Sequence, residues 1–164
     1  MKITHAHRFD APLADVWAML TDVGFGHARA AAMGTEAQDV DVDEREDGSY
    51  AVMLRADVPT TSIPSEMRAF LGRELSVTYT EVWEPPEGAD DRVGTFAVEI
   101  AGAPGHVAGA IGLTPDGDAT DFLAAGDVTA HVPVVGAMIE RAVADAVQRA
   151  LTAQLEAADA WLAR

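Results

Sequence analysis

The sequence has 164 residues, of which 49% are hydrophobic, and its 27 acidic and 11 basic side chains give a formal net charge of −16. A chain of this length can bury roughly 70% of the surface that its unfolded form exposes, so we expect a single domain over residues 1–164. The negative charge repels nucleic-acid phosphates and anionic lipid head groups, which argues against nucleic-acid binding. The sequence has no cysteine, which excludes disulfides, thiol catalysis and Cys-ligated metal sites.

The composition also bears on the source and the location of the protein. The chain contains 32 Ala, one Lys and no Asn, which favours a GC-rich coding bias; a salt-rich habitat is the alternative. On either interpretation the acidic residues are mostly a solvated surface. The N-terminus lacks the apolar run of a signal peptide, and no stretch approaches 18 uncharged apolar residues. We therefore expect a cytoplasmic protein without stable membrane insertion.

The first predicted element is a strand over residues 2–9, because Ile3, His5, His7 and Phe9 alternate with more polar residues. Pro12 favours the start of a helix, which should end near residues 21–22. A second, Ala-rich helix is expected over about residues 25–33, closed by Gly34.

Strands separated by turns follow, with Asp47-Gly48 as a tight hairpin turn. The expected strands cover residues 40–46, 49–56, 74–84, 92–101, 106–114 and 119–131. The stretch 57–72 contains Pro59 and Pro64, and we expect one or two helical turns within it. After Pro133, apolar residues recur at helical spacing and predict a helix of about 30 residues that lies against the sheet.

This order of elements, and several motifs, resemble the helix-grip fold of the START/SRPBCC superfamily, which includes lipid-transfer domains and polyketide cyclases. The motifs are the entry Phe9-Asp10-Ala11-Pro12-Leu13-Ala14-Asp15-Val16-Trp17, then Ile63-Pro64-Ser65-Glu66, Gly102-Ala103-Pro104 with Gly109, and Val132-Pro133-Val134-Val135-Gly136-Ala137-Met138-Ile139-Glu140. The last three are similar to an actinobacterial branch of the superfamily that is described as a domain of unknown function.

The resemblance implies an α+β fold of order β-α-α-β6-α, in which a curved antiparallel sheet wraps around the long C-terminal helix. A strongly curved sheet cannot follow a straight helix along its whole length, so a cavity is expected between them. Ala142, Ala146, Ala150 and Ala158 lie on the apolar stripe of that helix. These small side chains favour either a roomy cavity or a closer approach of helix to sheet, and the sequence leaves both open.

Several side chains are candidates for chemistry. His5 and His7 share one face of the first strand, but without a third placed ligand they predict imidazoles that line the core or cavity, and no metal site. We expect Glu81 and Glu99 to face solvent; the alternative is an inward carboxylate with a raised pKa that acts as acid or base. No Ser lies in a nucleophile elbow and no Gly-rich motif fits a phosphate, so we expect no cofactor.

Three functions remain open: a protein that holds a hydrophobic, lipid- or polyketide-like ligand, a cyclase- or aromatase-type enzyme, and a ligand-free partner-binding module. We expect the first, in a monomer or weak homodimer, with residues 63–71 as a lid. The residues expected to contact the ligand are His5, His7, Met33, Met53, Phe70, Tyr79, Trp83, Phe96, Val135 and Met138.

Overall fold

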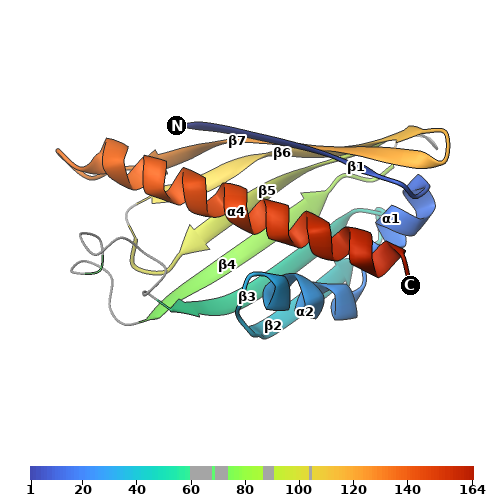
Figure 1. Ribbon diagram of the computed structural model, residues 1–164, viewed down its shortest axis with the longest axis horizontal. Coiled ribbons are helices and arrows are strands. Elements are labelled where there is room, and N and C mark those ends of the chain that lie inside the picture. Colours follow the sequence, from blue (N-terminus) through green and yellow to red (C-terminus); the bar gives the residue numbers. More distant parts are fainter. Residues whose placement is uncertain (60–67, 69–73, 87–90, 104) are drawn as a thin grey trace.

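A twisted antiparallel sheet of seven strands lies against one long C-terminal helix, α4 (Gly136–Leu162) (Figure 1). The computed structural model describes residues 1–59, 68, 74–86, 91–103 and 105–164. The strands are β1 (Lys2–Phe9), β2 (Ala37–Glu44), β3 (Tyr50–Pro59), β4 (Glu74–Trp83), β5 (Arg92–Ile100), β6 (Gly105–Asp116) and β7 (Ala119–Ala130). Helices α1 (Leu13–Leu20) and α2 (Val23–Ala32) separate β1 from β2. The predicted α+β helix-grip architecture is confirmed.

The sheet has the order β1-β7-β6-β5-β4-β3-β2. Strands β2 to β7 therefore lie side by side in the order in which they occur in the chain. β1 pairs with β7, which places β1 and β2 at opposite edges, and α1 and α2 carry the chain across. The predicted turn between β2 and β3 contains Gly48, whose φ of 83° suits a residue without a Cβ. The Asp47 carboxylate stabilises this turn by accepting a hydrogen bond of 2.9 Å from the backbone N–H of Ser49.

Helix α2 begins at Val23, two residues before the predicted start. Asp22 causes the difference, because its side chain accepts hydrogen bonds from the backbone N–H groups of Gly24, at 2.7 Å, and of Phe25, at 3.2 Å. This is the role of an N-cap residue. Phe25 and Arg29 lie four residues apart on this helix, and both are buried.

Helix α4 has 27 residues and is therefore about 40 Å long at ~1.5 Å per residue. It begins at Gly136 instead of directly after Pro133, because the chain first makes a turn in which Val134 has a φ of 70°. α4 contacts β1, β7, α1 and α2 and diverges from β3 and β4. No helix in the described part of the chain is long and apolar enough to cross a membrane.

The hydrophobic core lies where α1, α2 and the second half of α4 meet the sheet. Its largest fully buried members include Phe9, Phe25 and Trp83, and Leu155 and Ala158 join it from α4. β3 continues to Pro59, three residues past the predicted end of the strand at Ala56. Helical turns were expected within residues 57–72. Beyond the end of β3, that stretch lies outside the described residues except for position 68.

Candidate ligand-binding site

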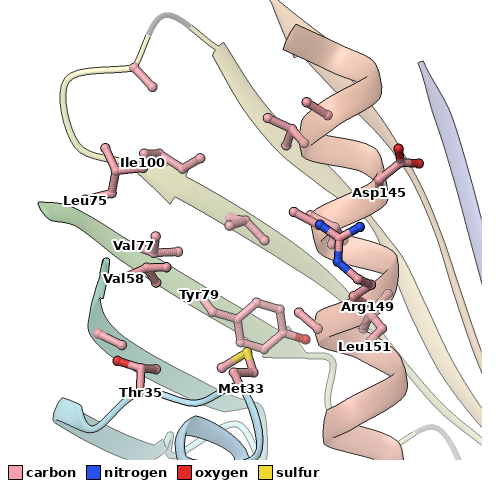
Figure 2. A pocket seen from close by; sticks show the side chains of 18 of the residues that line it. Met33, Thr35, Val58, Leu75, Val77, Tyr79, Ile100, Asp145, Arg149 and Leu151 are labelled. Carbon is pink, nitrogen blue, oxygen red and sulfur yellow. The ribbon is translucent and has the colours of Figure 1, made fainter. Parts of the chain in front are cut away.

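A cavity of about 1080 Å³ lies between α4 and strands β3, β4 and β5. From the sheet it is lined by Leu54, Ala56, Val58, Leu75, Val77, Tyr79, Phe96, Val98 and Ile100. From α4 it is lined by Ile139, Ala142, Val143, Asp145, Ala146, Val147, Arg149, Ala150, Leu151, Ala153 and Gln154, and elsewhere by Ala32, Met33, Thr35, Ala103, Val132 and Val135. Figure 2 shows the strand side chains and the helix side chains facing each other across this space.

The cavity wall follows from strand periodicity and register. Each of the three strands contributes three residues spaced by two, which therefore point to one face of the sheet. The register places Tyr79 opposite Leu54 on β3 and opposite Val98 on β5, so the three rows form one continuous apolar surface. Opposite this surface, α4 presents small side chains, including Ala142, Ala146 and Ala150.

The inward-facing residues of β4 change from apolar to polar at one end of the cavity. Leu75, Val77 and Tyr79 line the apolar space, and the next two residues on the same face are Glu81 and Trp83, which are buried. Figure 2 shows Tyr79 projecting from β4 toward Leu151 on α4, with Met33 beside it. This end of the cavity is therefore where apolar lining gives way to buried polar groups.

A buried polar cluster lies at that end, formed by Arg29, Glu81, Tyr79, Trp83 and Gln154. The Arg29 guanidinium donates to Glu81 Oε1 at 2.5 Å and to Gln154 Oε1 at 2.9 Å. Glu81 also accepts from the Tyr79 hydroxyl at 2.6 Å and from the Trp83 indole N–H at 3.0 Å. The exposed fractions of Arg29, Glu81 and Gln154 are 6%, 2% and 8%. The cluster is thus a paired charge whose hydrogen bonds replace those lost to water.

The charge states in this cluster follow from its contacts. Burial would raise the pKa of Glu81, but the charge of Arg29 and the hydrogen bonds from Arg29, Tyr79 and Trp83 outweigh it, so the pKa lies below its ordinary value. Burial opposes the charged form of Arg29, yet the Glu81 carboxylate raises its pKa above the ordinary value. Burial and the Glu81 charge hold the pKa of the Tyr79 hydroxyl well above 10. Near neutral pH the cluster therefore contains Arg29 charged, Glu81 ionised and Tyr79 neutral.

The expected ligand-contacting residues fall into three groups. Met33, Tyr79, Phe96 and Val135 line the cavity. Met53, Trp83, Met138, His5 and His7 are absent from its lining, and Phe70 lies outside the described residues. Among the second group, Trp83 belongs to the hydrophobic core, Met53 is on the other face of β3 from Leu54, and Met138 is largely exposed near the start of α4.

The two histidines of β1 connect that strand to α4. His5 Nδ1 lies 3.5 Å from Gln148 Oε1, and His7 Nε2 lies 3.0 Å from Asp159 Oδ1. Both contacts lie on the side where α4 meets β1, away from the cavity lining. In the described part of the chain, no group of three or more His, Asp or Glu side chains is placed to hold a metal ion.

The expected orientation of Glu81 was wrong. β4 is an interior strand, and Glu81 is on its inward face because it follows Tyr79 by two residues, whereas Glu99 is exposed as predicted. Arg29 and Gln154 were not identified from the sequence. The available signal was their spacing: Arg29 follows buried Phe25 by four residues, and Gln154 follows buried Leu151 by three. Polar residues at apolar-face positions of two helices indicate a buried polar contact.

The sequence matches the model of a protein family described as "Protein of unknown function (DUF2505)" over residues 4–162. Among curated proteins, none matches this sequence.

Solved structures share the fold at low sequence identity. The Zhui aromatase/cyclase from Streptomyces sp. R1128 is 19% identical, with a TM-score of 0.64 over 100% of this chain and 94% of that one. TTHA0849 from Thermus thermophilus is 14% identical, with a TM-score of 0.64 over 99% and 97% of the two chains. The protein Ara h 8.0201 is 10% identical, with a TM-score of 0.53 over 99% and 97%. The chain belongs to the DUF2505 family, and it has the helix-grip fold of the START/SRPBCC superfamily.

Proposed function

We propose that the protein binds a small hydrophobic molecule, lipid- or polyketide-like, in the cavity between α4 and strands β3 to β5. The observation that carries the proposal is the cavity itself. Its volume of about 1080 Å³ is slightly above the ~300–1,000 Å³ that ligand pockets usually have. Its lining is mostly aliphatic and aromatic, with Tyr79 and Gln154 as polar groups at one end.

The physical basis of binding would be the removal of apolar ligand surface from water. Each 100 Å² of such surface stabilises the complex by about 2.5 kcal/mol, from which the entropy cost of association is subtracted. An apolar wall supplied by three strands and one helix surrounds a ligand on opposite sides, which favours extensive burial. The name of one structural neighbour, an aromatase/cyclase, supports polyketide-like molecules as one class to examine.

An enzyme of the cyclase or aromatase type is the second candidate, and it needs an acid or base in the cavity. The structure offers less support for it than for binding. Glu81 is not in the cavity lining, its carboxylate is engaged by Arg29, Tyr79 and Trp83, and its pKa is lowered instead of raised. His5 and His7 also lie outside the lining. We therefore favour binding over catalysis.

The first experiment measures binding directly. Native mass spectrometry after mild purification, followed by solvent extraction, detects a co-purified ligand. In parallel, titration with the apolar fluorophore N-phenyl-1-naphthylamine measures occupancy of the cavity, because its emission increases in apolar surroundings. We expect saturable binding that a hydrophobic competitor displaces.

A matched pair of variants then locates the site. Ala150→Phe places an aromatic ring on the cavity side of α4, and Ala160→Phe places the same ring on the same helix at an exposed position outside the cavity. We expect the first to weaken fluorophore binding at least tenfold and the second to leave it within twofold of the wild type. A clean ligand-free mass together with no saturable fluorophore binding would refute the proposed function.

A further inference from the structure

We propose that the cavity selects an apolar ligand that carries an uncharged oxygen acceptor, such as a ketone or ester carbonyl, and that the side-chain amide of Gln154 is the group that recognises it. This inference rests on the proposed function, because it assigns the chemistry of the ligand in the same cavity. It is carried by the way the buried cluster holds Gln154.

The orientation of the Gln154 amide is set by Arg29. The Nε–H of Arg29 donates to Gln154 Oε1 at 2.9 Å, and because an arginine has no acceptor, the amide oxygen must be the atom that faces it. The amide nitrogen therefore points the other way. It lies 3.2 Å from the sulfur of Met33, and both residues line the cavity.

A thioether sulfur is a weak acceptor, and the amide nitrogen has two hydrogens to donate. Gln154 is buried, so a strong acceptor there would gain a hydrogen bond without competition from bulk water. Met33 is an unbranched side chain with several rotatable bonds, so its sulfur can move aside. A carbonyl oxygen of a ligand would take the place of that sulfur as the acceptor.

The charges at this end of the cavity favour a neutral acceptor over a carboxylate. The positive charge of Arg29 is paired with Glu81, and the hydroxyl proton of Tyr79 is also donated to Glu81. A ligand carboxylate beside Gln154 would therefore be buried without a counter-charge, which is costly. A ketone or ester oxygen accepts the same hydrogen bond without that cost.

The remainder of the ligand would extend along α4. Gln154 and Val135 both line the cavity and are 19 residues apart. That separation corresponds to a length of about 28 Å along a helix at ~1.5 Å per residue. Asp145 and Arg149 line this part with exposed side chains of opposite charge. The alternative is a ligand with an anionic head group, which would bind at Arg149 instead of Gln154. The experiment must distinguish this alternative from recognition of a neutral oxygen by Gln154.

The experiment displaces N-phenyl-1-naphthylamine with three ligands of equal chain length: dodecane, 2-dodecanone and dodecanoate. The measured quantity is the dissociation constant of the ketone divided by that of the alkane. We expect this ratio to increase about tenfold in Gln154→Leu and in Gln154→Glu, because the carbonyl is then buried without a donor. Gln154→Glu keeps an oxygen acceptor for Arg29, so it preserves that hydrogen bond if Gln154→Leu does not fold.

Gln148→Leu is the matched control, because Gln148 is on the same helix but outside the cavity lining, and we expect it to keep the ratio within twofold. In the wild type at pH 8, dodecanoate should bind more weakly than 2-dodecanone. An unchanged ratio in both Gln154 variants would overturn the proposal. So would tighter binding of dodecanoate that is lost in Arg149→Leu. If none of the three ligands displaces the fluorophore, the proposed function itself fails.

Discussion

The two parts of helix α4 meet their surroundings in different ways. From Leu155 onward the helix packs into the hydrophobic core, where Ala158 is 1% exposed, Leu155 is buried and Trp161 contacts the ring of Phe25. From Ile139 to Ala153 most of the side chains that face the sheet line a cavity instead, although Ala144 is buried in the core. Both parts have apolar residues at the same helical spacing, so amphipathicity alone does not distinguish packing from cavity.

The difference comes from what lies opposite the helix. The second part faces α1, α2 and the ends of β1 and β7, which supply Phe9, Phe25 and Phe122. The first part faces the cavity wall formed by β3 to β5, and four of the side chains with which it lines the cavity are alanines. The Arg29–Glu81–Gln154 cluster lies at the boundary between the two parts. One helix packed against a curved sheet can thus contribute to the hydrophobic core at one end and to the wall of a cavity at the other.

Removing one charge from the buried polar cluster should have the largest effect on stability. Glu81→Leu leaves the Arg29 guanidinium buried without its counter-charge, so we expect the free energy of unfolding to fall by about 3–5 kcal/mol, measured by urea denaturation. The double variant Arg29→Met/Glu81→Leu removes both charges and should recover much of the loss. If the double variant is less stable than the single one, the pair is not the source of the effect.

Truncating one leucine in each part should separate core from cavity. Leu155 and Leu75 have similar exposed fractions, 7% and 5%, but Leu155 belongs to the packed core and Leu75 lines the cavity. We expect Leu155→Ala to cost about 3 kcal/mol and Leu75→Ala about 1 kcal/mol, because a side chain beside empty space has fewer contacts to lose. Urea denaturation of the two variants measures both costs. Equal costs would show that the space beside Leu75 is filled in solution.

Much of the fold could be predicted because its signals are local. The alternation of Ile3, His5, His7 and Phe9 predicted β1 with its observed bounds, and the Asp47-Gly48 turn was confirmed. Boundaries that depend on a specific contact were missed. The start of α2 is set by hydrogen bonds to Asp22, and the start of α4 follows the turn that contains Val134.

The site was harder to predict because it depends on pairings between distant residues. Met33, Tyr79 and Phe96 were expected to contact a ligand and do line the cavity. The Arg29–Glu81 pair joins residues 52 positions apart, and the Arg29–Gln154 pair joins residues 125 positions apart. Neither pairing is visible in local periodicity, so the burial of Glu81 could not be distinguished from exposure on an edge strand.

Enlarging one alanine in each part of α4 should have a smaller but equally informative effect. Ala158 is surrounded by core side chains, so Ala158→Phe overfills that space and should cost about 1–3 kcal/mol of unfolding free energy. Ala150 lines the cavity, so Ala150→Phe has room and should cost less than about 1 kcal/mol. Thermal denaturation of both variants checks this, and a severe loss in Ala150→Phe would contradict the presence of an open cavity.

Mild acidification should give the smallest effect, and its sign follows from Glu81. The pKa of this carboxyl is lower in the folded protein than its ordinary value of 4.5, so Glu81 binds its proton more readily in the unfolded chain. The contribution of the cluster to stability is therefore fully present well above pH 4.5 and is lost as the pH falls through the lowered pKa. Other carboxylates, including exposed Asp47 and partly buried Glu140, also have lowered pKa values, so the wild type must be compared with a variant in which only the cluster is removed.

That comparison uses the wild type and Arg29→Met/Glu81→Leu, with the unfolding free energy of each measured by urea denaturation across the pH range. We expect the difference between them to be constant from about pH 8 to about pH 6 and to shift against the wild type below about pH 4.5. A difference that stays constant down to about pH 3 would show that Glu81 is not held as a carboxylate by Arg29.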